Sequence, residues 1–327
     1  MDRRRFLLTS LASAVAVPLG AGAQQAGKVY RIGFLSGGTA AAQKLPVEQF
    51  RQGLRQLAYI EGQNIIIEHR WADGQLDRLS QLATDLVRIA PDLIVAVASQ
   101  AAVAAHNATT SIPIVMVFVG DPIYLGLATS LGRPGKNLTG LTSFGPELAA
   151  KQLSLLTEVV PKVKRTAVLS NPGNPLTPRW QKEVDAAAQA LALQLHHLSI
   201  TGADDVAPAF RDAMKGGAGA MLVASDAVVD LQAAQISALA LSNRMPTMSA
   251  ARLLMEAGAL MTYSIDSLAV FQRAATYVDK ILRGARPGDL PIEEPTKFRL
   301  VINLKTAKAL GLTIPPSLLL RADQVIE

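Results

Sequence analysis

The sequence predicts an α/β protein built as two similar units, each a mainly parallel sheet covered by helices. From residue 29 onwards, short runs rich in aliphatic and β-branched residues alternate with longer segments whose apolar residues have helical spacing. The short runs are continuously apolar, which is typical of strands buried on both faces. A chain of 327 residues also exceeds what one hydrophobic core usually serves, so two domains are expected.

In the first unit we expect four buried strands, at 29–35, 65–68, 93–97 and 114–119. Apolar residues recur at helical spacing in 47–57 and 79–89, so each of these segments presents one apolar stripe to the sheet. A third, shorter helix is expected at 101–108. The segment 134–140 combines Pro, Gly and Asn, and we expect it to link the two units.

The second unit repeats the pattern but not the sequence of the first. Its expected strands are 166–170, 193–199 and 220–224. Its expected helices are 175–191, 204–215 and 228–243. Beyond them we expect a strand at 261–265, an amphipathic helix at 268–282, a last strand at 298–304 and a short helix at 306–310.

The first 23 residues have the pattern of an export signal. Three arginines at 3–5 precede the apolar run 6–18, which is too short to span a bilayer, and the small residues 21–23 suit signal peptidase, so cleavage after Ala23 is expected. The order Arg3-Arg4-x-Phe-Leu also matches a twin-arginine signal. The alternative is a short amphipathic helix or a membrane anchor. The export signal favours a periplasmic location.

Composition excludes several classes of function. Cysteine is absent, which rules out disulfides, thiolate catalysis and cysteine-ligated metals. Removal of residues 1–23 takes away three arginines and one aspartate, which lowers the formal net charge from +6 to +4. The remaining basic residues are scattered without interleaved aromatic residues, so no nucleic-acid partner is expected.

Small polar residues follow the expected strands, at the edge of a parallel sheet where ligands bind. We take them as candidate ligand-binding residues: Ser36, Ser99, Gln100 and Asp121 from the first unit, and Asn171, Asn174 and Asp226 from the second. The alternative at each position is a helix cap or turn, and Asp121 before a proline suits a turn well. Trp71 and Trp180 could stack on a ligand or be structural.

The sequence gives little support to an enzyme. The adjacent His196 and His197 would point to opposite faces of a strand and so would not form a metal site. There is no Gly-x-Ser-x-Gly elbow, no His-Glu-x-x-His helix and no phosphate-binding glycine loop. We therefore expect no catalytic residues, no metal and no cofactor.

The chain resembles the ABC transporter substrate-binding family that includes tryptophan-binding lipoproteins, a group of type I periplasmic binding proteins. The matching stretches are RIGFLS (31–36), FRQGLR (50–55), EGQN (61–64), GDP (120–122), PGKNLTG (134–140), AATYVDK (274–280) and the tail from PTKF (295–298) to residue 316. Together they cover nearly the whole chain after the signal. The ligand contacts that this resemblance implies coincide with the seven strand-end residues named above.

The resemblance implies two Rossmann-like lobes with parallel sheets and a hinge. It implies that residues 28–141 plus 262–291 form one lobe and that 142–261 plus 292–327 form the other, so that the chain crosses between lobes three times. Pattern alone would also allow everything after residue 140 to stay in one domain.

The resemblance also implies a function, which is capture of a small molecule between the lobes and delivery to an ABC permease in the inner membrane. An amino acid or small carboxylate is the expected ligand, with Asp121 or Asp226 holding an ammonium group. The scarcity of aromatic residues argues against a sugar. We expect a monomer. The alternative is a periplasmic sensor that presents its ligand-bound form to a receptor, and an enzyme on the same scaffold is a third interpretation.

Overall fold

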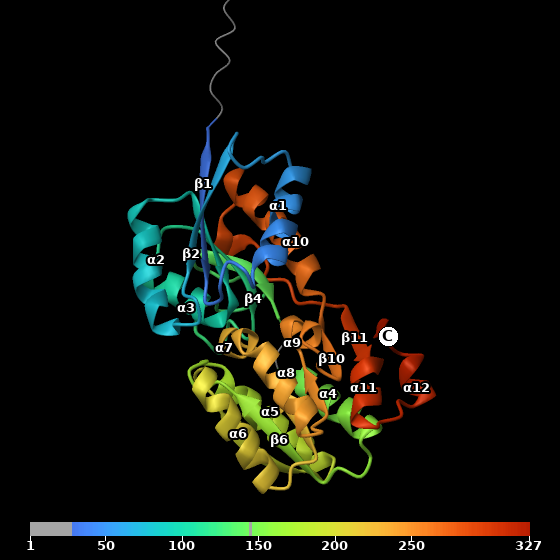
Figure 1. Cartoon of the computed structure of the whole chain (residues 1–327). Coiled ribbons are helices and arrows are strands. Elements are labelled where there is room, and N and C mark those ends of the chain that lie inside the picture. Colours follow the sequence, from blue (N-terminus) through green and yellow to red (C-terminus); the bar gives the residue numbers. More distant parts are fainter. Residues whose placement is uncertain (1–27, 144–145) are drawn as a thin grey trace, which may run out of the picture.

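The computed structural model describes residues 28–143 and 146–327 as two lobes, each built on its own sheet (Figure 1). We call the lobe with the five-stranded sheet lobe I and the lobe with the seven-stranded sheet lobe II. The expected export signal lies outside the described residues. No helix in those two ranges combines the length and the apolar character that crossing a membrane requires. The α/β fold class with two mainly parallel sheets is confirmed.

The sheet of lobe I is parallel throughout, in the order β2-β1-β3-β4-β5. Its strands are β1 (Tyr30–Ser36), β2 (Ile65–Trp71), β3 (Leu93–Val97), β4 (Ile114–Val119) and β5 (Leu138–Thr142). One face packs against α1 (Lys44–Gln56) and α10 (Ser267–Leu282). The other packs against α2 (Leu79–Arg88) and α3 (Ala98–Ala108), and the short 3-10 turn η1 (Leu76–Arg78) precedes α2.

Strand β5 corrects the expectation of a linker at 134–140. Its register places Gly140 opposite Met116 of β4, so the second half of the expected linker belongs to the sheet. Gly140 has a φ of +137°, and a Cβ atom there would lie 2.0 Å from the Met116 carbonyl oxygen. The position needs glycine for close strand approach. Gly140 also contributed to the prediction of a linker, because an isolated glycine interrupts the apolar pattern of a strand.

The sheet of lobe II has the order β12-β11-β10-β9-β8-β6-β7 and is parallel except between β10 and β11. Its strands are β6 (Arg165–Ser170), β7 (Gln194–Ser199), β8 (Ala220–Val223), β9 (Thr247–Ser249), β10 (Met261–Ile265), β11 (Phe298–Asn303) and β12 (Gln324–Ile326). Strands β9 and β12 were not expected. Each has three residues, too few for a period-2 pattern to be recognised.

Helices cover both faces of the lobe II sheet. The first group is α6 (Ala203–Lys215), α7 (Ala227–Leu231), α8 (Ala233–Ser242) and α9 (Arg252–Glu256). The second group is α4 (Pro146–Val159), α5 (Thr177–Ala190), α11 (Leu304–Leu310) and α12 (Pro316–Leu319). The single helix expected at 228–243 is two helices in the structure, α7 and α8, with a break at residue 232. The end of α7 lies at the boundary between the lobes.

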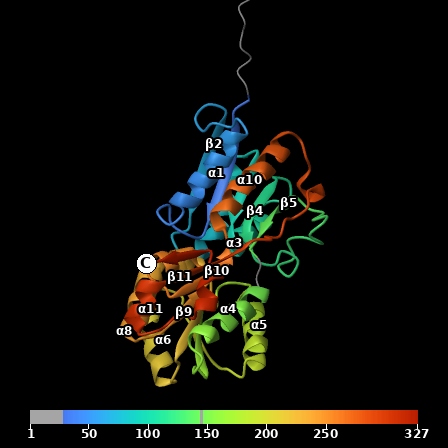
Figure 2. The same ribbon diagram turned by 90° about the vertical axis from the view of Figure 1, so that its right-hand side faces the viewer.

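The described residues pass between the lobes after β10 and after Glu293 (Figure 2), and β5 and α4, on either side of residues 144–145, belong to different lobes. The expected boundary at residue 262 falls inside β10, which pairs over its whole length with β11 of lobe II. The chain therefore leaves lobe II after Ile265. Helix α10 then packs beside α1 on the lobe I sheet, as Figures 1 and 2 both show. The 3-10 turn η2 (Pro287–Asp289) follows it on the same lobe.

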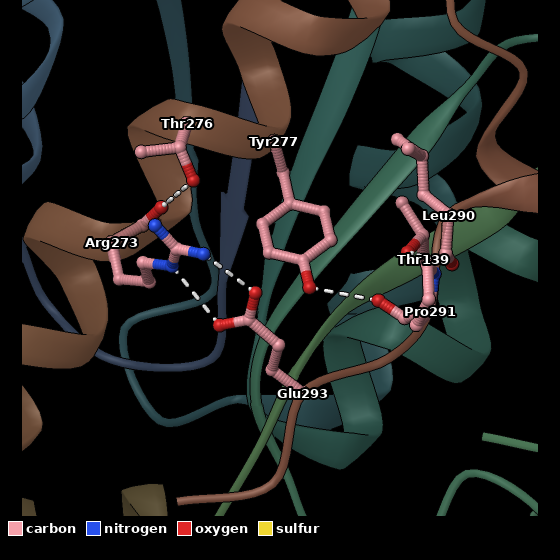
Figure 3. Close-up of polar contacts among 7 residues, drawn as sticks. All are labelled: Thr139, Arg273, Thr276, Tyr277, Leu290, Pro291 and Glu293. Carbon is pink, nitrogen blue, oxygen red and sulfur yellow. Dashed lines mark hydrogen bonds and ion pairs between the residues drawn. The ribbon is translucent and has the colours of Figure 1, made fainter. Parts of the chain in front are cut away.

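A polar clamp fixes the last connection to lobe I (Figure 3). The guanidinium of Arg273 on α10 donates two hydrogen bonds to the Glu293 carboxylate, at 3.0 and 2.7 Å. The Tyr277 hydroxyl donates to the Pro291 carbonyl at 2.8 Å, and Thr139 donates to the Leu290 carbonyl at 2.8 Å. These contacts hold the connection against α10 and β5. The segment that crosses to lobe II therefore begins after Glu293 and not at residue 291.

His69 on β2 packs at the edge of the lobe I core without a hydrogen-bond partner among the described residues. His69 stacks on Trp71, with ring centroids 5.1 Å apart, and lies 5.2 Å from Phe34. Both ring nitrogens are buried and have no hydrogen-bond partner among the described residues. Burial, with a further contribution from the Arg51 charge, lowers the pKa of His69 below its usual value. The folded chain therefore favours the neutral ring.

The unfolded chain takes up a proton at residue 69 more readily than the folded chain does, so acid should weaken folding. The stability that neutral His69 contributes is present above the usual histidine pKa of about 6.5 and is lost as pH falls below it. We expect His69→Phe to reduce the difference in free energy of unfolding between pH 8 and pH 5, measured by urea denaturation. An unchanged difference in the His69 variant would contradict this account.

Candidate functional site

A cavity of about 220 Å³ lies between the lobes, where the carboxyl ends of strands from both sheets meet. Lobe I contributes the ends of β1, β3 and β4 and the first residues of α3. Lobe II contributes the end of β8, the start of α5, and helices α7 and α9. Of the described residues that line the cavity, the charged ones are Asp226, Asp230 and Arg252. The rest are neutral polar or apolar.

The backbone is strained where β3 and β4 reach the cavity. Ala98, directly after β3, has a φ of +69°, and Phe118 near the end of β4 has a φ of +63°. Positive φ is unfavourable for residues with a side chain, and for a bulky residue it is a true outlier. Both residues line the cavity. Strain of this kind concentrates at binding and active sites, where surrounding structure holds the backbone in place.

The carboxylate of Asp226 is the centre of the polar network in the cavity wall. Its Oδ1 accepts hydrogen bonds from the Asn171 amide and from the Val228 backbone N–H, each at 2.9 Å. Its Oδ2 accepts from the Asn174 amide at 2.9 Å and from the Gln100 amide at 2.7 Å. Four donors fill the acceptor positions of one carboxylate, so Asp226 is fully satisfied inside the protein.

Direct contacts between the lobes show that the structure is a closed form. Gln100 of α3 in lobe I reaches Asp226 of lobe II. Farther out, Arg179 of α5 forms an ion pair with Asp121, and its guanidinium lies 5.3 Å from the centre of the Tyr124 ring. The lobes therefore touch both at the cavity wall and at its outer edge.

Gly120 allows an especially close apolar contact between the lobes. A Cβ atom at Gly120 in lobe I would lie 2.2 Å from a methyl carbon of Leu176 in lobe II. A side chain there would push Leu176 aside or part the lobes. In this form the absence of a side chain directly after β4 lets Leu176 of lobe II approach the lobe I backbone.

Apolar side chains form the remaining wall of the cavity. Phe118 comes from β4 and Phe271 from α10, while Leu148 and Trp180 come from α4 and α5. Trp180 is therefore placed to touch a ligand, whereas Trp71 packs in the lobe I core on His69. The cavity thus has a polar side near α3 and α7 and an apolar side between aromatic residues.

The structure brings five of the seven expected site residues to the cavity lining: Ser36, Ser99, Gln100, Asn174 and Asp226. Asn171 is buried behind the wall and supports Asp226. Asp121 does not line the cavity. It accepts hydrogen bonds from the N–H groups of Ile123 and Tyr124, at 3.0 and 2.9 Å, and pairs with Arg179. It has the turn role considered for it above and also joins the lobes.

A family model described as ABC transporter substrate binding protein matches residues 37–326. The chain belongs to the ABC transporter substrate-binding protein family. Among curated proteins, a tyrosine-binding protein from Clostridioides difficile is 27% identical over 263 residues, which are 80% of this chain and 75% of the relative.

Solved structures agree with this assignment and with a type I periplasmic binding protein fold. An ABC domain from Streptococcus pneumoniae in complex with L-Trp is 26% identical with a TM-score of 0.84, and the match covers 91% of this chain and 99% of that one. A conserved domain protein from Vibrio cholerae is 28% identical with a TM-score of 0.86, covering 91% and 100%. A substrate-binding protein from Clostridium difficile, in its ligand-free open form, is 25% identical over 91% and 99% of the chains and has a TM-score of only 0.66. The lower score at similar identity fits the closed arrangement of this substrate-binding protein.

Sequence analysis missed Asp230, Arg252 and Gln43, which also line the cavity. Asp230 lies one helical turn after Asp226, because the two carboxylates are at positions i and i+4. The signal that could have revealed it is this spacing directly after a strand. Arg252 is held by Glu256 and donates to the Ala42 carbonyl at 3.4 Å. Among the described residues no group of three or more His, Cys, Asp or Glu could hold a metal ion.

Asp230 is electrostatically unusual within this substrate-binding protein. Its Oδ1 is sealed from solvent and has no hydrogen-bond partner among the described residues. Burial, reinforced by the nearby Asp226 carboxylate, raises the pKa of Asp230 to about 7. The folded protein therefore favours the neutral carboxylic acid at this position.

This raised pKa predicts a pH-dependent stability cost that requires no ligand to detect. An unfolded aspartate ionises near pH 4, so the cost grows as pH rises from about 4 to 7 and is complete above pH 7. We expect Asp230→Asn to raise the free energy of unfolding by roughly 1–3 kcal/mol at pH 8 and by clearly less at pH 4.5, close to the ionisation of the unfolded aspartate. Urea denaturation at both pH values checks this, with exposed Asp204→Asn as control. Destabilisation at pH 8 would contradict it.

Proposed function

We propose that this substrate-binding protein captures a free amino acid between its lobes outside the cytoplasm and delivers it to an ABC permease without converting it chemically. The observation that carries the proposal is the cavity between the lobes, which has an acidic wall on one side and an uncapped helix N-terminus on the other. This arrangement suits a zwitterion, whose ammonium and carboxylate groups need opposite partners.

The N-terminus of α3 supplies the site for the ligand carboxylate. No side chain caps this 11-residue helix, and its first residues, 98–101, line the cavity. The first N–H groups of a helix lack partners within the helix and attract anions. The Ser99 hydroxyl lies beside them and accepts from the Gly120 N–H at 3.2 Å, which leaves its own proton free to donate.

The acidic wall on lobe II supplies the site for the ammonium group. It consists of Asp226 at the N-cap of α7 and Asp230 within α7, and Asp230 is the one whose Oδ1 accepts no hydrogen bond from the described residues. A ligand that bridges the two walls stabilises the closed form, because each end of the ligand is bound by a different lobe.

The apolar side of the cavity supports an amino acid with an apolar or aromatic side chain. Phe118, Trp180 and Phe271 can contact such a side chain. The binding free energy gained would be proportional to the apolar surface area of the ligand that these contacts bury. The names of two relatives agree, since one is described as tyrosine-binding and another is a complex with L-Trp.

A ligand panel tests the proposal. We expect L-tryptophan, L-tyrosine or L-leucine to raise the melting temperature of the purified protein, because a ligand bound only by the folded form stabilises it. D-glucose and D-arabinose should have no effect. Isothermal titration calorimetry then gives the affinity. Failure of all common L-amino acids to bind would overturn the proposed ligand class.

Gln100→Ala should weaken binding of the amino acid found in this panel. The variant removes the hydrogen bond that joins α3 to the Asp226 carboxylate across the cavity, and a hydrogen bond to a charged group contributes about 1.5–3 kcal/mol. The dissociation constant should therefore rise roughly 10- to 100-fold. Gln189→Ala, at an exposed position of α5, is the matched control. Equal affinity of the Gln100 variant and the wild type would contradict the role of this contact.

We also propose export to the periplasm, cleavage after Ala23 and action as a monomer. The mature chain should then begin at Gln24, which mass spectrometry of protein from a periplasmic extract can measure. Replacing Ala21 and Ala23 by arginine should block cleavage, because signal peptidase needs small residues there. Replacing Arg3 and Arg4 by lysine distinguishes the two routes, since only the twin-arginine route requires the arginine pair. Periplasmic protein that still begins at Met1 would count against the cleavage prediction.

A further inference from the structure

Asp230 is the acidic residue of the cavity with free acceptor capacity. Both oxygens of the Asp226 carboxylate already accept two hydrogen bonds each from the protein. Asp230 lines the same cavity, and its Oδ1 is buried with no hydrogen-bond partner among the described residues. A buried carboxylate in this position costs free energy unless it gains a proton or a cation.

Arg252 is the nearby cation, and its charge acts to lower the pKa of Asp230 but does not outweigh burial and the Asp226 carboxylate. On its own helix it faces Asp226, which repels a second negative charge. From α9 it faces Arg252 and Glu256, and the Arg252 guanidinium is engaged by the Glu256 carboxylate and the Ala42 carbonyl. From α3, the loop before α5 and the start of α1, the nearby cavity residues are the neutral Gln100, Asn174 and Gln43.

We propose that Asp230 determines specificity for a ligand with an ammonium group, and that this ammonium replaces a proton which Asp230 holds while the cavity is empty. The proposal rests on the proposed function, capture of an amino acid, and adds the residue that selects it and the dependence on pH. The exchange is balanced: the neutral carboxylic acid loses one proton to solvent, and the resulting carboxylate pairs with the ligand ammonium, whose own protons stay in place.

The proton held by Asp230 competes with the ligand. Because the pKa of Asp230 lies near 7 in the empty cavity, binding should become weaker as pH falls below 7. The apparent affinity should be about tenfold lower at pH 6 than at pH 8. The α-ammonium and α-carboxylate groups of a free amino acid both stay ionised over this range, so the ligand itself does not titrate.

Calorimetry with L-tryptophan and L-tyrosine tests the exchange. Titrations at pH 6, 7 and 8, in phosphate and in imidazole buffer, report both affinity and proton release, because the two buffers both titrate near pH 7 but take up protons with different enthalpies. For the wild type at pH 6 we expect nearly one proton released for each ligand bound, and roughly tenfold weaker binding than at pH 8. At pH 8 the released fraction should fall towards zero.

Two controls isolate the residue and the ligand group. Asp230→Asn cannot release a proton, so its affinity should vary little with pH and should be about 10- to 100-fold lower than that of the wild type at pH 8. Exposed Asp204→Asn should behave as the wild type. The deaminated analogue 3-indolepropionate should bind the wild type without proton release, and should bind the Asp230 variant at least as well.

The outcomes separate this inference from the proposed function. Binding whose pH dependence and proton release are the same in Asp230→Asn and the wild type would overturn the role of Asp230 and leave amino-acid capture in place. If neither L-tryptophan nor L-tyrosine binds at any of these pH values, the exchange is also overturned, and the wider panel then decides on the proposed function. The thermal stability of the empty variants shows that each is folded.

Discussion

The closed form depends on one buried carboxylate shared between the lobes. Asp226 caps α7 through the Val228 N–H, holds Asn171 and Asn174 of its own lobe, and accepts from Gln100 of the other lobe. Its charge is satisfied by neutral dipoles and not by a cation. Such dipoles stabilise the charge but do not cancel it, so its field persists in the cavity and acts on Asp230.

The contacts between the lobes are individually weak, so a ligand that touches both lobes would add to closure. The ion pair of Asp121 with Arg179 is partly exposed, and pairs of this kind contribute at most about 1 kcal/mol. The bond from Gln100 to Asp226 contributes about 1.5–3 kcal/mol. These favourable contributions are opposed by the conformational entropy that is lost when the lobes stop moving about their connections. A ligand that binds both lobes adds to these contacts and shifts the population further to the closed form.

The sequence predicted the sheet strands with continuous apolar runs and most of the site, because the strand-end rule depends only on parallel sheets whose carboxyl ends meet. It could not give the direction of each side chain. Asp121 turns to its own loop N–H groups, a local hydrogen bond that competes with a role in the cavity. It also missed Asp230, because a helical acidic residue is usually solvated, whereas the Oδ1 atom of this one is sealed from solvent.

The two acidic residues of α7 differ through their hydrogen bonds and not through their chemistry. Asp226, at the helix start, receives the unpaired N–H of Val228 and three side-chain amides. Asp230, one turn later, faces the cavity after the helix has satisfied its own N–H groups, so no backbone donor is left for it. These unequal surroundings leave Asp230, and not Asp226, with an oxygen that lacks a donor. Asp226 can therefore join the two lobes while Asp230 stays available to the ligand. One carboxylate could not do both, because the protein donors that satisfy it would leave no acceptor position for the ligand.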